Sequence, residues 1–126
     1  MFHVYLRLVS DDGDPGAVTR ALGVEPDRTT RSGERSAKTG KTYGFSSWRA
    51  AVGRDVDADG LDAVFGGLLS WDAHRLRDLG WEVSLIVVQE FRDRDDPGEK
   101  GISVSADLVR WLADARAGLE IDQYLY

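Results

Sequence analysis

The chain has 126 residues, a formal net charge of −6 and no cysteine. This length predicts one domain over 1–126, and the lack of cysteine excludes disulfides, thiol catalysis and sulfur-bound zinc. The longest unbroken apolar run covers only 85–88, far short of the ~20 residues of a membrane-spanning helix. Because the N-terminus also lacks a secretory pattern, we expect a cytoplasmic protein with no membrane contact.

The first third of the chain predicts a strand, a capped helix and a loop. Residues 2–9 alternate between apolar and mixed side chains, which is typical of a β-strand. Asp14 and Pro15 are typical of an N-cap and a first helical position, and Gly23 is typical of a helix end. From 24 to 42 there is no periodicity, and the composition predicts a long basic loop.

The middle of the chain predicts a strand, helical segments and a buried strand. Residues 43–52 read as the second strand, and apolar residues between 61 and 69 recur at helical spacing. A further helical piece should end at Gly80, a typical helix stop. The centre of 81–91 is apolar on both faces, which indicates a strand inside the sheet.

The last segment predicts a charged turn at 92–100, a short strand at 102–104 and a helix that Ser105 caps and Gly118 ends. A final strand should follow at 119–126. The order β-α-β-α-β-β-α-β predicts an α+β fold. We expect a single, mostly antiparallel sheet of about five strands, with about three helices packed on one face.

The two ends of the chain carry a family resemblance. The opening strand contains Leu6-Arg7-Leu8, and the chain closes with Leu119-Glu120-Ile121-Asp122-Gln123-Tyr124. Between them lie Leu22-Gly23, Trp48 and Gly101-Ile102-Ser103. This arrangement resembles the bacterial family called domain of unknown function 4279 over nearly the whole chain. The resemblance implies a small soluble domain that binds a partner, of immunity type, and it supplies no reaction and no catalytic residues.

Positive charge is concentrated between residues 28 and 54, where seven basic residues accompany one acid. This window therefore carries +6, which leaves −12 for the rest of the chain. Arginine and hydroxyl side chains suit carboxylate or phosphate oxygens, so we interpret the window as a site for an anion or an acidic partner. Pairing with the chain's own acids is the alternative. The candidate residues are Arg28, Arg31, Arg35, Lys38, Lys41 and Arg49.

A second candidate surface is the sheet face that the helices would leave open. A face rich in tyrosine, tryptophan and arginine suits a protein partner or a second copy of the chain. The alternative is that the long loop covers this face and makes it a second core. The candidate residues are Tyr5, Arg7, Trp48, Asp122, Tyr124 and Tyr126, together with His3.

No catalytic or metal-binding motif is complete. Asp55, Asp57 and Asp59 match half of a calcium loop, but its twelfth position is Gly66 instead of glutamate. The simpler interpretation is that Asp57 or Asp59 caps the next helix. Calcium binding by these residues stays an open alternative. No motif indicates a catalytic triad, although distant residues could assemble one in space. We therefore name no catalytic residue, no metal ligand and no cofactor.

These observations favour a non-enzymatic module that binds a protein through its basic loop. The alternative is a small-ligand or anion-binding protein, or an enzyme, with a pocket under the 28–41 loop. Converging arginine, tryptophan and tyrosine side chains would favour the ligand, and a flat aromatic face would favour a protein. Nucleic acid ranks third, because the −12 remainder repels a long polyanion and no stacking aromatic lies at 24–42.

Overall fold

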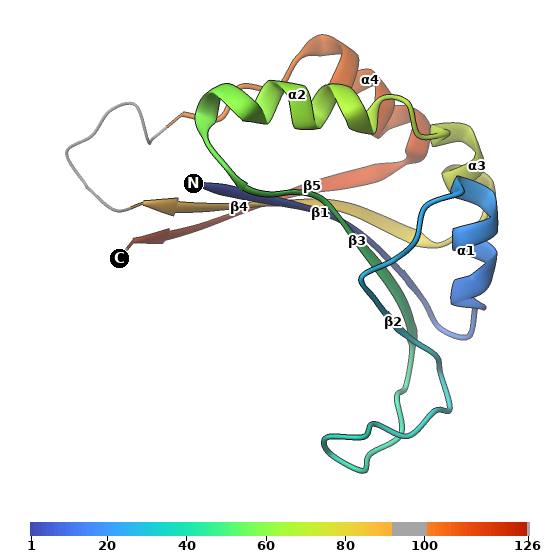
Figure 1. Ribbon diagram of the computed structural model, residues 1–126. Coiled ribbons are helices and arrows are strands. Elements are labelled where there is room, and N and C mark those ends of the chain that lie inside the picture. Colours follow the sequence, from blue (N-terminus) through green and yellow to red (C-terminus); the bar gives the residue numbers. More distant parts are fainter. Residues whose placement is uncertain (92–100, 126) are drawn as a thin grey trace.

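The computed structural model describes residues 1–91 and 101–125. In this part of the chain, one five-stranded sheet has the strand order β2-β3-β1-β4-β5, and four helices pack on it (Figure 1). The strands are β1 (Phe2–Ser10), β2 (Arg28–Thr30), β3 (Ser46–Val56), β4 (Glu82–Phe91) and β5 (Ala117–Leu125). The helices are α1 (Pro15–Leu22), α2 (Ala58–Leu68), α3 (Ala73–Asp78) and α4 (Ala106–Ala115).

The predicted α+β class is confirmed, but the sheet is mixed, because one strand pair is parallel. β1 runs antiparallel to β3 and β4, and β2 runs antiparallel to β3. β5 instead runs parallel to β4, because α4 carries the chain back along the helix side of the sheet before β5 begins. The described residues also contain four helices, one more than expected.

The alternation predicted for the first strand is confirmed, and it separates two different faces of the sheet. All four helices lie on the same face, as Figure 1 shows. On that face the side chains of Val4, Leu6 and Leu8 are completely buried, as are Leu85 and Val87 of β4. Burial of this apolar surface is the main force that holds the helices to the sheet. No helix of the described residues covers the opposite face, which we call the open face.

The helix ends follow the predicted capping residues, with one exception. Asp14 accepts a hydrogen bond from the Gly16 N–H at the start of α1. Asp57 accepts one from Gly60 at 2.7 Å and begins α2, and Ser105 begins α4. The predicted end of the last helix at Gly118 is wrong. Arg116, in the left-handed conformation, ends α4 instead, and Gly118 already belongs to β5.

Several element boundaries also differ from prediction. The second strand, expected at 43–52, is β3 at 46–56, and residues 102–104 form no strand. The basic loop expected at 24–42 contains β2, because three of its residues pair with β3. The turn predicted at 92–100 and Tyr126 lie outside the described residues. Within residues 1–91 and 101–125, no helix is both long enough and apolar enough to span a membrane.

A basic hairpin joins β2 to β3, and we define it as residues 31–45. Its two arms are held by an antiparallel bridge between Arg35 and Thr42. The Gly33 N–H donates to the Tyr43 carbonyl at 3.0 Å, and the Ser36 N–H donates to the Lys41 carbonyl at 2.8 Å. In Figure 1 the hairpin extends from one end of the sheet, away from the helices. It therefore borders the open face at its β2 side.

Candidate functional site

Three arginines lie side by side on the open face. In the strand register, Arg49 of β3 is opposite both Arg28 of β2 and Arg7 of β1. Neighbouring strands are ~4.8 Å apart, so one small ligand can reach all three guanidinium groups. We call this set the arginine row. Like charges directly opposite one another destabilise a sheet. The row therefore opposes folding unless an anion neutralises it.

The arginine row has no acidic partner among the residues that the structure describes. Other arginines of the described residues do form ion pairs, for example Arg54 with Asp27 at 3.0 Å. The Arg49 guanidinium carbon lies 4.9 Å from the centre of the Tyr5 ring, which orients it. Its Nε atom is nevertheless buried and has no hydrogen-bond partner. Among the described residues, the row therefore keeps one buried donor without an acceptor.

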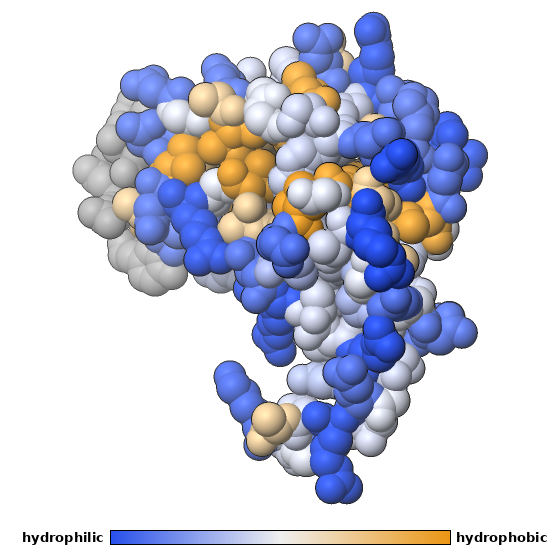
Figure 2. Space-filling model, turned by 45° about the vertical axis from the view of Figure 1, so that its right-hand side comes forward, coloured by the Kyte–Doolittle hydropathy of each residue, from blue (hydrophilic) through white to orange (hydrophobic). Residues whose placement is uncertain are grey.

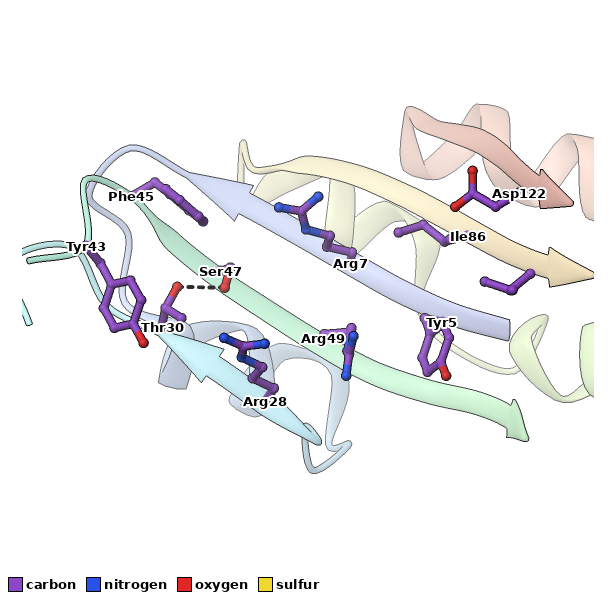
Figure 3. A pocket seen from close by; sticks show the side chains of 11 residues that line it. Tyr5, Arg7, Arg28, Thr30, Tyr43, Phe45, Ser47, Arg49, Ile86 and Asp122 are labelled. Atoms are coloured by element: carbon purple, nitrogen blue, oxygen red, sulfur yellow. Dashed lines mark hydrogen bonds between the residues drawn. The ribbon is translucent and has the colours of Figure 1, made fainter. Parts of the chain in front are cut away.

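The arginine row lines a cavity of about 410 Å³. This volume falls within the ~300–1,000 Å³ that is typical of small-ligand sites. Hydroxyl groups accompany the arginines, and Figure 3 shows the hydrogen bond of 2.7 Å between Thr30 and Ser47 at the β2 side. Apolar side chains of β4 lie at the other side. The lining residues are Tyr5, Arg7, Arg28, Thr30, Tyr43, Phe45, Ser47, Arg49, Ile86, Val88 and Asp122.

The basic hairpin supplies part of this lining. Tyr43 stands at its base, where its N–H donates to the Glu34 carbonyl at 2.9 Å. A neighbouring hollow shares Arg28 and Tyr43 with the cavity and also includes Lys38 near the hairpin tip. The space-filling view shows the hydrophilic hairpin standing apart from the larger body of the molecule (Figure 2). The cavity is therefore bounded by the sheet on one side and by the hairpin base on another.

The six basic candidates of the 28–54 window lie in different parts of the structure. Arg28 and Arg49 line the cavity. Arg31 instead forms an ion pair with Asp14 and lies 3.9 Å from Glu34, so internal pairing holds for this one residue. The other three lie exposed on the basic hairpin, and only one of them borders the neighbouring hollow. They are Arg35, Lys38 and Lys41.

The structure also divides the candidates from the sheet face. Tyr5, Arg7 and Asp122 line the cavity, whereas Tyr124 lies on the open face outside it and is half exposed. Placing Trp48 on the open face is wrong. Its side chain is completely buried on the helix side, where its Nε1–H donates to Thr19 Oγ1 at 3.0 Å. An aromatic ring with a buried hydrogen-bond partner is a core residue and not a surface anchor.

Several lining residues were missed by the sequence reasoning. Tyr43, Phe45 and Ser47 precede Arg49 at a spacing of two, so they share its face as the chain enters β3. That spacing was a usable signal once Arg49 was assigned to the open face. Thr30 carries no such signal, because only its pairing with Ser47 shows that residues 28–30 form a strand.

His3 lies on the open face but outside the cavity. Its Nε2 is 3.5 Å from a Glu90 oxygen and 3.7 Å from an Asp55 oxygen, and its Nδ1 accepts the Asp55 N–H. These contacts occupy both ring nitrogens, so we assign His3 a structural role. In residues 1–91 and 101–125, no three histidine or carboxylate side chains are grouped as metal ligands. Asp57 of the half calcium motif acts as the cap of α2.

An ionic cluster ties the basic hairpin to α1. Asp14 contacts Arg20 at 3.2 Å and also pairs with Arg31 at the base of the hairpin. The hydrogen bond from the Gly16 N–H, followed by that from Arg20, holds the pKa of Asp14 below its usual value of 3.8. Asp14 therefore stays ionised and keeps Arg31 directed away from the arginine row.

Comparison with known proteins identifies a family. The family described as Domain of unknown function (DUF4279) matches residues 1–126, the whole chain. Neither the curated proteins nor the solved structures contain a match. The match spans both the arginine row and the strands that align it. The chain therefore belongs to the DUF4279 family.

Proposed function

We propose that this protein binds a small organic anion, a phosphate ester or a carboxylate, in the cavity on the open face. The observation that carries the proposal is the arginine row: three arginines at opposed register positions, without an acidic partner among the described residues. An anion supplies the negative charge that no described residue places against the row. Bidentate hydrogen bonds from a guanidinium group to phosphate or carboxylate oxygens are among the strong hydrogen bonds of proteins.

The chemistry of the lining supports binding over catalysis. Hydroxyls of Thr30, Ser47 and Tyr43 add neutral donors beside the arginines. The described lining contains one carboxylate, that of Asp122, and no histidine, so it offers no pair of groups for general acid–base work. We therefore assign the site to recognition of an anion and name no catalytic residue.

Titration calorimetry with phenyl phosphate and with benzoate tests the proposal. The wild-type chain is expected to bind at least one of them, and Arg49→Met should weaken that binding by roughly 10- to 100-fold. Arg54→Met is the matched control, because Arg54 lies on the same strand but pairs with Asp27 outside the cavity. Equal loss in both variants, or no binding of either anion to the wild type, would contradict the proposal.

A protein partner is the second candidate, and β5 is the observation that favours it. β5 is an edge strand of nine residues whose Leu119, Ile121 and Leu125 are 38 to 47% exposed. A free edge of this length can accept an extended segment as an added strand. Self-pairing is disfavoured, because an antiparallel copy centred on Ile121 would place Glu120 opposite Asp122. The partner segment should therefore carry basic residues on the open-face side and apolar residues on the other.

Capture from the native host separates the two candidates. Ile121→Lys should abolish retention of a partner that adds to β5, while phenyl phosphate binding stays intact. Arg49→Met should do the reverse. If Ile121→Lys and the wild type retain the same proteins, β5 is not the docking edge.

A further inference from the structure

We propose that Asp122 makes this cavity selective for anions that carry an ammonium or N–H donor at their opposite end. The inference rests on the proposed function, since it specifies which organic anions the cavity takes. Asp122 lines the same cavity as Arg7, Arg28 and Arg49. No hydrogen bond or ion pair joins its carboxylate to another of the described residues. Opposite charges thus share one cavity without neutralising each other.

The strand register is what keeps these charges apart. Arg7 lies opposite Ser84 of β4, which pairs with Gly118 of β5. Asp122 follows four residues later and pairs with Val88. With ~4.8 Å between strands and ~3.3 Å per residue, the Cα atoms of Arg7 and Asp122 are about 16 Å apart. A direct ion pair cannot span that distance, so both charges stay available to a ligand.

Apolar side chains fill the interval between the two charges. Ile86 lies between Arg7 and Asp122 in Figure 3, and it is opposite Tyr5 in the strand register. Ile86 and Val88 are half-buried, so they offer an apolar floor on the open face. The site is therefore polar at both ends, with opposite signs, and apolar in the middle.

This layout defines the shape of the ligand. Its phosphate or carboxylate contacts the arginine row, and its apolar or ring-shaped body covers Ile86 beside Tyr5. Its far end donates a hydrogen bond to the Asp122 carboxylate. Carboxylate–ammonium contacts are stronger than neutral hydrogen bonds, and they exclude a second anionic group from that end. Dianions with charge at both ends are thus rejected.

Two phosphate esters that differ in one group test the inference. O-phosphotyramine carries an ammonium group where 4-ethylphenyl phosphate carries only a hydrogen atom. By calorimetry, the wild type should bind O-phosphotyramine about 5- to 10-fold more tightly, the effect of one partly exposed charged hydrogen bond. Asp122→Asn should bind both esters equally.

Glu120→Gln is the matched control. Glu120 is an exposed carboxylate on the same face of β5, but it does not line the cavity. This variant should keep the preference. If it loses the preference as Asp122→Asn does, the general negative charge of β5 is responsible and the inference fails.

The remaining outcomes separate the inference from the proposed function. Equal binding of both esters to the wild type overturns the role of Asp122, while Arg49-dependent binding of both still supports an anion site. A preference that survives Asp122→Asn also overturns it. If neither ester binds the wild type, the proposed function fails and the inference fails with it.

Discussion

The two faces of the sheet are built on the same strands, but only one of them is complete by itself. On the helix side, Val4 and Leu6 are fully buried and the Trp48 indole N–H has its acceptor. On the open face, Arg7 is exposed and the buried Arg49 Nε has no acceptor. The helix side therefore stabilises the folded state, whereas the arginine row on the open face destabilises it.

This difference separates the side chains that folding stability explains from those that it does not explain. A side chain that packs and satisfies its polar atoms is explained by stability alone. Three opposed arginines are not, because mutual repulsion raises the free energy of the folded state. Binding sites commonly keep such unfavourable arrangements. The contrast predicts that substitutions in the helix-side core lower the free energy of unfolding, whereas removing a charge from the arginine row raises it.

The largest expected effect is on the helix side. Trp48→Ala should lower the free energy of unfolding by about 3–5 kcal/mol, because it empties a fully buried site and removes the bond to Thr19. Tyr5→Ala, on the open face, should cost much less. Urea denaturation measures both. If the two variants lose equal stability, the open face is a second core and the contrast fails.

The contact between β3 and α2 gives the next effect. A Cβ on Gly53 would lie 2.7 Å from a methyl carbon of Val64, so Gly53→Ala should cost roughly 1–3 kcal/mol in urea denaturation. Adding Val64→Ala should restore part of this loss, because it removes the clashing methyl groups. A double variant no more stable than Gly53→Ala would place the strain elsewhere.

Relief of charge on the open face should have the opposite sign. Arg7→Gln is expected to raise the free energy of unfolding by about 0.2–1 kcal/mol, because it removes one of three opposed charges. The gain should shrink at high salt, which screens the repulsion. The same variant should weaken phenyl phosphate binding. Thermal melts at two salt concentrations measure the effect. If Arg7→Gln is less stable than the wild type at low salt, repulsion within the arginine row does not destabilise the fold.

The smallest expected effect is the pH dependence at Asp14. Its pKa is lowered in the folded state by the Gly16 N–H and Arg20, so its stabilising contribution is complete above the unfolded pKa. That contribution is lost as the pH falls through the folded pKa, below about pH 4. Asp14→Asn should therefore reduce, slightly, the loss of stability between about pH 4 and pH 2. Urea denaturation across this range measures the effect. If the free energy of unfolding falls as steeply with pH in Asp14→Asn as in the wild type, Asp14 does not contribute to the loss of stability in acid.

Much of the local structure could be predicted because its causes are local. The alternation of β1 lies in consecutive residues, and each N-cap bonds to an N–H two or three residues away. The α+β class follows from the order of such elements. The direction of β5 could not be predicted in this way, because strand pairing depends on α4 and the chain that leads into it.

The face that Trp48 occupies could not be read from its own strand. Around β3 the two alternating sets are nearly matched: Phe45 and Ser47 on one side, Ser46 and Trp48 on the other. Period two identifies the sets but not which of them meets the helices. Trp48 is assigned to the core by its acceptor on α1, Thr19, which lies 29 positions earlier in the chain.

The sequence by itself determined most of the elements, most of their caps and an excess of positive charge between residues 28 and 54. Only the tertiary structure decided which of those charges act together. Arg31 is drawn to Asp14, whereas Arg28 and Arg49 are aligned with Arg7, which lies outside the basic window. The physical reason is strand register: hydrogen bonding between backbones places distant side chains opposite one another, regardless of their charge.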